Sequence, residues 1–169
     1  MCQKAKKIVI KEIRLHGFNA IPWIFQDPKL KIIHLIRDPR GIYNSLLSRP
    51  GGPWPTKNQS IEMCQQLSLD LKILKDLDAS RYMAVKFEDI VQNPSEVFTN
   101  LNQKLNLQFD TSSLIQSYRN HQSKSQKYFK TYRKKGYDAH HWRKYLKYKT
   151  QKRLTEECLE YLELAQYSI

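Results

Sequence analysis

The residues best suited to chemistry in this chain are Arg37 and Ser45, which stand eight positions apart on either side of a helix start. Asp38 is a typical helix N-cap, and Pro39 loses no hydrogen bond at the first helical position. Ser45 follows the cap by two turns and faces nearly the same way as the start of the helix. Free backbone N–H groups and the helix dipole both favour an anion at such a start. The spacing predicts that Arg37 and Ser45 bind one phosphate, although an ordinary capped helix with a surface arginine would show the same pattern.

The elements that must position these residues are strands alternating with helices. Apolar runs predict strands at Lys7–Leu15, Lys31–Ile36 and Tyr82–Phe87. Helical periodicity predicts helices at Arg40–Leu47, Ser60–Leu77, Pro94–Leu105 and Thr150–Glu163. This alternation is typical of an α/β fold, a parallel sheet flanked by helices on both faces. Ligands of such sheets bind at the carboxyl ends of the strands, which is where Arg37 stands.

Two local patterns refine these expectations. Asn93, Pro94 and Glu96 predict a capping box at the start of the third helix. A buried stripe is expected on the second helix, at Cys64, Leu67, Leu71, Leu74 and Leu77.

The strand, the Arg-Asp-Pro-Arg sequence and Ser45 together resemble the 3′-phosphate-binding motif of sulfotransferases, which take a sulfuryl group from 3′-phosphoadenosine 5′-phosphosulfate (PAPS). The segment from Tyr82 to Pro94 resembles the family's next core strand, with Phe87 where a Tyr is common. Near the end, Arg133 precedes Trp142 as in the carbohydrate branch of the family. The resemblance implies that Arg133 is a third ligand of the 3′-phosphate.

Weaker ligand candidates beside Arg133 are Lys134 and Lys135. The resemblance also bears on the chain's end, where Gln166 stands at a position that suits a glycine helix cap.

The resemblance implies a P-loop-like sulfotransferase fold in which residues 1–169 form a single partial domain, truncated at its N-terminus. No Gly-containing loop that could hold the 5′-phosphosulfate precedes Arg37. We therefore expect PAPS as co-substrate, a glycan hydroxyl as acceptor and no transfer by the isolated chain. An inactive relic of a sulfotransferase is an alternative.

No residue presents itself as the catalytic base, and no cluster has the spacing of metal ligands. The five histidines are scattered. His34 lies in the middle of a predicted strand and is expected in the core or behind the site. His16 follows the first predicted strand and is a weak candidate for a base.

The formal net charge of +13 is concentrated near the C-terminus. Residues 119–153 hold thirteen Lys or Arg against one acid, Asp138, with aromatic residues between them. Such a run could bind an acidic glycan, the phosphates of the donor or nucleic acid, or could form a solvated face. A heparin- or RNA-binding module without PAPS chemistry is the rival hypothesis. Nucleic acid is not the expected partner, because a polyanion binder has no need of the Arg37 and Ser45 spacing.

The sequence says less about the compartment. No apolar run approaches the ~20 residues of a membrane span. The resemblance implies a Golgi protein whose membrane anchor would lie upstream of Met1. Cys64 and Cys158 fall near helical cysteines of the carbohydrate branch, so a disulfide and two separate buried thiols are both open.

Overall fold

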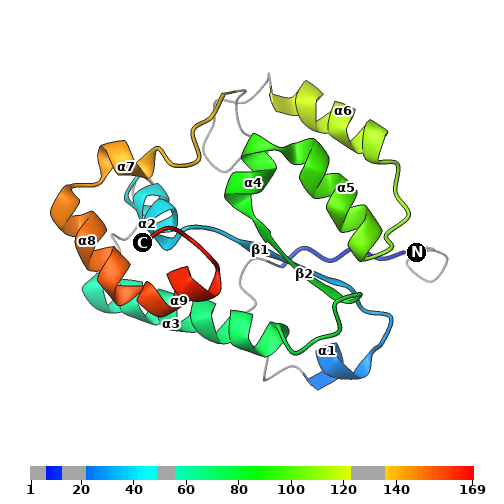
Figure 1. The fold of residues 1–169 in the computed structure, drawn as a ribbon, viewed down its shortest axis with the longest axis horizontal. Coiled ribbons are helices and arrows are strands. Elements are labelled where there is room, and N and C mark those ends of the chain that lie inside the picture. Colours follow the sequence, from blue (N-terminus) through cyan, green and yellow to red (C-terminus); the bar gives the residue numbers. More distant parts are fainter. Residues whose placement is uncertain (1–6, 13–21, 49–55, 123–135) are drawn as a thin grey trace.

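Two parallel strands lie at the centre of the molecule, with helices around them (Figure 1). The computed structural model describes residues 7–12, 22–48, 56–122 and 136–169. In these ranges the strands are β1 (Ile32–Ile36) and β2 (Tyr82–Lys86). The helices are α1 (Pro22–Gln26), α2 (Pro39–Leu47), α3 (Lys57–Leu74), α4 (Phe87–Gln92), α5 (Pro94–Lys104), α6 (Thr111–Gln122), α7 (Trp142–Tyr145), α8 (Tyr148–Glu157) and α9 (Leu159–Leu164).

The helices cover both faces of this small sheet. Ile36 of β1 is buried against Leu71 of α3 and Tyr161 of α9. Val85 of β2 points to the opposite face, because it pairs with Leu35, and it is buried against Val97 of α5. The parallel α/β arrangement predicted from the sequence is therefore confirmed. The helices predicted at Arg40–Leu47, Ser60–Leu77 and Pro94–Leu105 are also present, as α2, α3 and α5, and no end is shifted by more than three residues.

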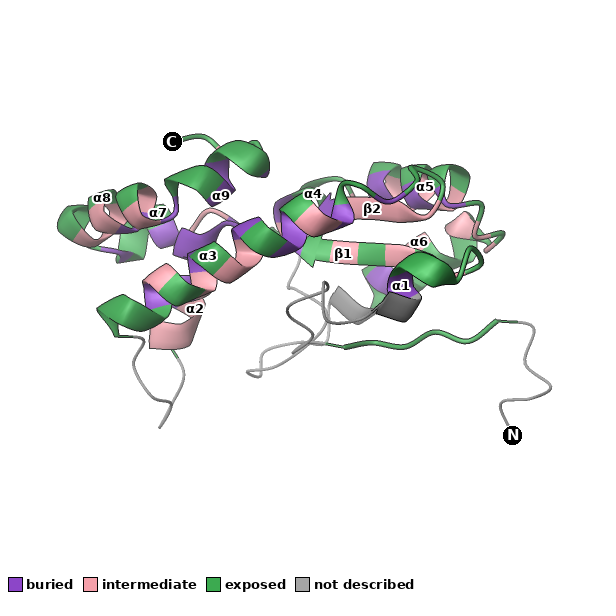
Figure 2. Cartoon of the chain, turned by 90° about the horizontal axis from the view of Figure 1, so that it is seen from below, coloured by how far each residue is buried: buried purple, intermediate pink, exposed green. Residues whose placement is uncertain are grey.

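The strand predicted at Lys7–Leu15 is wrong over residues 7–12, which form no regular structure. A strand needs a hydrogen-bonded neighbour and a buried face. Among the described residues this segment pairs with no strand, and it has no buried face, since all six residues are exposed (Figure 2) and Val9 is 92% exposed. Residues 13–15 lie outside the described ranges.

The capping box predicted for α5 is also wrong. Asn93 does precede α5 and Pro94 begins it, but the Asn93 side chain makes no capping hydrogen bond. The reason is that Asn93 also ends α4, where its backbone N–H donates to the carbonyl of Asp89 at 2.7 Å. The N–H that Glu96 would have accepted is therefore already used.

The helix predicted at Thr150–Glu163 is divided at Cys158 into α8 and α9. Cys158 forms a disulfide with Cys64 of α3, and their Cα atoms are 5.1 Å apart. Both residues are almost fully buried. The break and the disulfide together let α8 pack on α2 and α3 while α9 packs on α3.

The last helix ends in a Schellman motif whose left-handed residue is Gln166, with φ of 55°. The N–H of Tyr167 donates to the carbonyl of Leu162, and the N–H of Gln166 donates to that of Glu163. Glycine adopts this backbone conformation without the steric cost that a β-carbon adds. A glycine would suit position 166, as expected from the sequence, and the backbone of Gln166 is indeed strained there.

Replacing Gln166 with Gly is expected to raise the free energy of unfolding by about 0.5–1 kcal/mol, because the left-handed strain disappears. The backbone carbonyl that accepts from Lys86 Nζ is kept. Gln65→Gly, at an exposed site within α3, is the control and should lower stability by about 0.5–1 kcal/mol. Urea denaturation of both variants measures the effects; equal losses in the two would contradict the assignment.

Replacing both Cys64 and Cys158 with Ala is expected to cost about 2–5 kcal/mol of stability, because the disulfide closes a loop between residues separated by 94 positions. Thermal unfolding of the wild type with and without reductant should show the same loss, whereas the double variant should not respond to reductant. Alkylation of both thiols in the unreduced native protein would contradict the disulfide.

Candidate functional site

Arg37 lies at the carboxyl end of β1, directly beside the end of β2. The register pairs Ile36 with Lys86, so the next residues of the two strands, Arg37 and Phe87, are neighbours at one edge of the sheet. The Arg37 guanidinium carbon is 4.5 Å from the centre of the Phe87 ring, a cation–π contact. Sulfotransferases commonly have Tyr at the position of Phe87. Phe87 contacts the arginine through the face of its ring and has no hydroxyl to offer.

A buried ion pair between Asp38 and Arg40 determines the charge of this edge. Arg40 Nε and Nη2 donate to the two Asp38 carboxylate oxygens at 3.0 and 2.9 Å. The two residues are only 1% and 4% exposed. Asp38 is therefore neutralised by Arg40 and does not pair with its neighbour Arg37.

Two backbone N–H groups at the start of α2 already have acceptors, so the helix start offers an anion fewer free donors than the sequence favours. The N–H of Asp38 donates to Glu88 Oε1 at 3.2 Å, and the N–H of Arg40 donates to Asp38 Oδ1 at 2.9 Å. Asp38 is the N-cap, as predicted, but its cap uses one of the donors that an anion would need. An anion at this position depends on side chains more than on the helix end.

Side-chain donors without partners meet at Gly41. Arg37 Nε and Nη2 and Trp142 Nε1 are buried and make no hydrogen bond to any residue that the structure describes. A β-carbon on Gly41 would lie 3.2 Å from Trp142 Cδ1 and 3.4 Å from Arg37 Nε, so both side chains contact the first turn of α2 at this residue. Buried N–H donors are costly unless an acceptor reaches them. The arrangement fits an anion with several acceptor oxygens.

Two tyrosine hydroxyls donate hydrogen bonds behind Arg37, one to its backbone carbonyl and one to the Glu88 carboxylate. Tyr161 Oη donates to the carbonyl of Arg37 at 3.1 Å, and Tyr167 Oη donates to Glu88 Oε2 at 2.9 Å. Burial raises the pKa of both tyrosine hydroxyls, and the Glu88 carboxylate raises that of Tyr167 further. Both hydroxyls therefore stay protonated and keep donating at any physiological pH.

Ser45, the other predicted ligand on α2, is half-buried and lies one turn beyond Gly41 on the same face of the helix. Its neighbour Asn44 is buried and places Nδ2 3.2 Å from His141 Nε2. His141 Nδ1 is 2.8 Å from the carbonyl of Asp138, which can only accept, so Nδ1 carries the proton and Nε2 accepts from Asn44. The segment before α7 is thereby held against α2.

Several residues that the sequence singled out lie outside the described ranges: His16, Arg133, Lys134 and Lys135. His34 is half-buried, and its Nδ1 lies 3.2 Å from Tyr82 Oη on the neighbouring strand, away from the strand ends.

The residues that sequence reasoning missed are Arg40, Glu88, Tyr161 and the indole of Trp142. Arg40 belongs to the recognised motif, but only the fold shows that it pairs with Asp38 inside the protein. Within the described ranges no group of His, Cys, Asp or Glu residues is arranged to hold a metal ion. None of the helices described there is long and apolar enough to cross a membrane.

Replacing Arg40 with Ala is expected to cost about 3–5 kcal/mol of stability, because Asp38 would remain as a buried and unpaired carboxylate. Adding Asp38→Asn removes that charge, so the double variant should regain part of the loss. Urea denaturation of the wild type, both single variants and the double variant measures the coupling. Strictly additive losses would show that the two side chains do not interact.

Comparison with known proteins agrees with this geometry. The sulfotransferase family model matches residues 15–112, which is more than half of the chain and includes β1, α2 and β2. Carbohydrate sulfotransferase 1 of Danio rerio is 27% identical over 113 residues, which cover 55% of this chain and 27% of the relative. Carbohydrate sulfotransferase 5 of Homo sapiens is 27% identical over 116 residues, covering 55% and 28%. Carbohydrate sulfotransferase 7 of Mus musculus is 42% identical over 53 residues, covering 30% and 11%.

No solved structure matches the chain significantly. The chain spans less than a third of the length of the curated relatives that it matches. The match nevertheless includes the strand, the Arg37 turn and the helix start from which the candidate site is built. The chain belongs to the sulfotransferase family.

Proposed function

We propose that Arg37, assisted by Ser45, binds the 3′-phosphate of PAPS, and that the whole protein transfers the sulfuryl group to a hydroxyl of a glycan. The observation that carries this proposal is the Arg37 guanidinium, whose Nε and Nη2 are buried at the end of β1 without a hydrogen-bond partner in the described ranges. The glycan part rests on the carbohydrate sulfotransferases to which the chain is similar.

The two unpartnered atoms of Arg37 are the pair that suits a phosphate. Nε and Nη2 lie on one side of the planar guanidinium and can donate two parallel hydrogen bonds to two oxygens of one anion. Arg40 uses the same pair of atoms on Asp38, so that carboxylate is already taken. The positive charge of Arg37 therefore remains available to a ligand.

Trp142 supports the same assignment. It is 2% exposed, its Nε1 has no partner, and its ring edge contacts Gly41 beside Arg37. Arg40 and Arg143 lie over its ring, at 4.4 and 5.2 Å from the ring centre. Because Arg40 is paired with Asp38, the donors and charges that a phosphate monoester could use here are the indole N–H of Trp142 and the guanidinium groups of Arg37 and Arg143.

In the reaction, the acceptor hydroxyl oxygen forms a bond to sulfur while the bond from sulfur to the 5′-phosphate oxygen breaks. The hydroxyl proton goes to a base, and adenosine 3′,5′-bisphosphate leaves. The role of Arg37 is to hold the donor by the phosphate that does not react, so that the reacting end is oriented. No described residue is assigned as the base.

The disulfide between Cys64 and Cys158 supports a location in the secretory pathway, such as the Golgi lumen. Disulfides persist in oxidising compartments and are rare in the cytosol. Both sulfurs belong to almost fully buried residues that connect α3 to the C-terminal helices. PAPS-dependent sulfation of glycans in that compartment is consistent with this chemistry.

Replacing Arg37 with Ala is expected to weaken binding of adenosine 3′,5′-bisphosphate by about 1.5–3 kcal/mol, or more than tenfold, because a charge-assisted pair of hydrogen bonds is lost. Ser45→Ala removes a neutral hydroxyl and is expected to cost about 1 kcal/mol. Isothermal titration calorimetry on the 169-residue chain measures both effects.

Two comparisons make this test specific. Binding of 5′-AMP, which lacks the 3′-phosphate, should be weak and insensitive to Arg37→Ala. Arg119→Ala removes an exposed arginine from α6, which packs on α5 and not on α2, and should leave bisphosphate binding unchanged. Equal affinity of the wild-type chain for the bisphosphate and for 5′-AMP would overturn the proposal.

A further inference from the structure

Two tyrosines on consecutive helices are far more exposed than tyrosines in a folded protein usually are. Tyr145, the last residue of α7, is 74% exposed, and Tyr148, the first residue of α8, is 80% exposed. Neither packs in a hydrophobic cluster. Large aromatic side chains held in water at adjacent positions commonly mark a binding surface.

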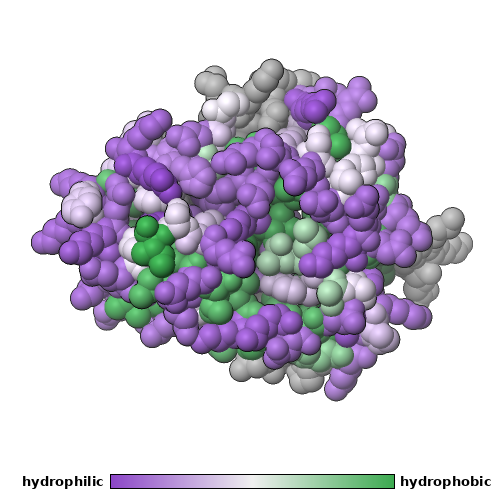
Figure 3. Space-filling view, in the orientation of Figure 1, coloured by the Kyte–Doolittle hydropathy of each residue, from purple (hydrophilic) through white to green (hydrophobic). Residues whose placement is uncertain are grey.

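Lysines surround these two rings. Residues 143–153 contain six basic residues and no acid. Lys144, Lys147, Lys149 and Lys152 are all exposed, and the surface over α7 and α8 is largely hydrophilic in Figure 3. We call the two tyrosines and these four lysines the α7–α8 patch.

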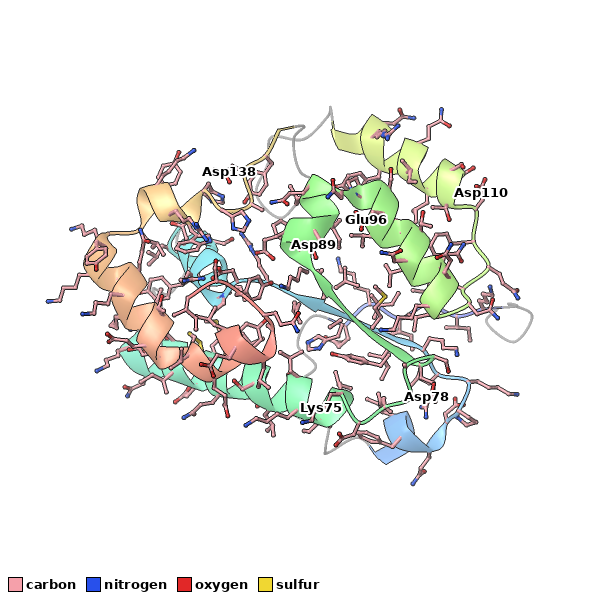
Figure 4. All side chains as sticks on the ribbon, viewed as in Figure 1. Lys75, Asp78, Asp89, Glu96, Asp110 and Asp138 are labelled. Atoms are coloured by element: carbon pink, nitrogen blue, oxygen red, sulfur yellow. A yellow bond between two sulfur atoms is a disulfide. The ribbon has the colours of Figure 1, made fainter. Side chains whose placement is uncertain are left out.

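Much of the positive charge of the α7–α8 patch is available to a partner. Among the described residues, Lys147 and Lys149 have no acidic partner. Lys144 contacts Asp138, the acid labelled beside α7 in Figure 4, at 3.3 Å, and Lys152 is 4.0 Å from Glu156. Such exposed pairs are weak and exchange readily with another anion.

A row of rings connects the α7–α8 patch to the Arg37 site. The distance between ring centres is 5.9 Å for Tyr145 and His141, 5.2 Å for His141 and Tyr137, and 6.3 Å for Tyr137 and Phe87. The Arg37 guanidinium lies over the Phe87 ring. Tyr137 and His141 are half-buried, so the row remains partly open to solvent. A long ligand that lies on the patch is therefore directed toward the phosphate site.

The chemistry of the patch suits an acidic saccharide chain. Tyrosine rings cover the apolar C–H faces of sugar rings while their hydroxyls exchange hydrogen bonds with sugar hydroxyls. The free cations are lysines, because Arg143 lies over Trp142 and Arg153 pairs with Glu157. Lysine ammonium groups on flexible side chains can attract sulfate or carboxylate groups at variable spacing. Arginine instead binds one phosphate through the two parallel N–H groups of its planar guanidinium.

We propose that the α7–α8 patch binds an anionic segment, sulfated or carboxylated, of the acceptor saccharide chain, whose hydroxyl reacts at the sulfuryl end of the donor that Arg37 holds. This proposal rests on the proposed function, because that function makes a saccharide the acceptor. According to this proposal, the acceptor saccharide binds at α7 and α8. A glycan that already carries acidic groups is then the preferred substrate.

The test uses the 169-residue chain with a sulfated heparin hexasaccharide, an uncharged hexasaccharide of N-acetylglucosamine and single-stranded poly-uridine RNA as probes. Tyr145→Ala/Tyr148→Ala removes the rings and keeps the charge, and Lys147→Gln/Lys149→Gln removes two charges and keeps the rings. Lys75→Gln/Lys104→Gln is the matched control, because it removes two exposed lysines, at the C-cap of α3 and at the last residue of α5 (Lys75 is labelled in Figure 4).

Both patch variants are expected to weaken binding of the sulfated hexasaccharide about fivefold or more, while the control leaves it unchanged. The lysine variant should also reduce the dependence of binding on salt concentration, because fewer counterions are released. The uncharged hexasaccharide should bind more weakly than the sulfated one. Thermal unfolding should be unaltered, because the substituted side chains are exposed.

Three results would overturn the proposal: an unchanged affinity in the tyrosine variant, an equal loss in the control, or RNA that displaces the hexasaccharide at equal charge concentration. Titration of the same samples with adenosine 3′,5′-bisphosphate separates this proposal from the proposed function. Failure of the wild type to bind the bisphosphate would contradict the proposed function. If the bisphosphate binds normally but the Tyr145→Ala/Tyr148→Ala variant binds the saccharide as well as the wild type does, only the proposal about the α7–α8 patch is contradicted.

Discussion

The buried ion pair between Asp38 and Arg40 is the interaction on which the candidate site depends. Asp38 caps α2 and would, without Arg40, be the nearest anion to Arg37. Because Arg40 occupies both oxygens of the carboxylate, Asp38 performs its structural role and Arg37 keeps its charge. Of the two arginines of the motif, Arg40 therefore pairs with a carboxylate of the protein, whereas Arg37 pairs with none in the described part of the chain.

Arg40 also connects distant parts of the chain to this point. It donates to Thr155 Oγ1 of α8 at 3.2 Å and to the carbonyl of Ser168 at 2.7 Å, and it lies over the ring of Trp142. The C-terminal helices are therefore attached to the start of α2 by the same side chain that neutralises Asp38. Since the disulfide attaches them to α3 as well, the C-terminal segment is part of the site's support and not an appendage.

The parallel register explains why the parts of the site meet. With Ile36 opposite Lys86, residues that follow the strands come together in matching order: Arg37 with Phe87, and Asp38 with Glu88. A shift of one residue would separate both pairs and would also exchange the buried and exposed faces of the strands. The ring row from Phe87 to Tyr145 extends this strand-end geometry along the surface to α7.

The sequence by itself determined the elements that depend only on residues close together in the chain. The apolar run before Arg37 and the Asp38 cap with Pro39 were sufficient to predict β1 and α2, because caps and periodicity act within a few residues.

Only the tertiary structure decided which polar groups remain free. The sequence favours free N–H groups at the start of α2, but Glu88 and the Asp38 carboxylate accept two of them. It also favours a capping box at Asn93, but the backbone N–H of Asn93 donates to the carbonyl of Asp89 in α4. The strand predicted at residues 7–12 needed a neighbour, and the disulfide needed α3 beside Cys158. Each outcome depends on what another segment brings to the same place, and a local pattern does not contain that information.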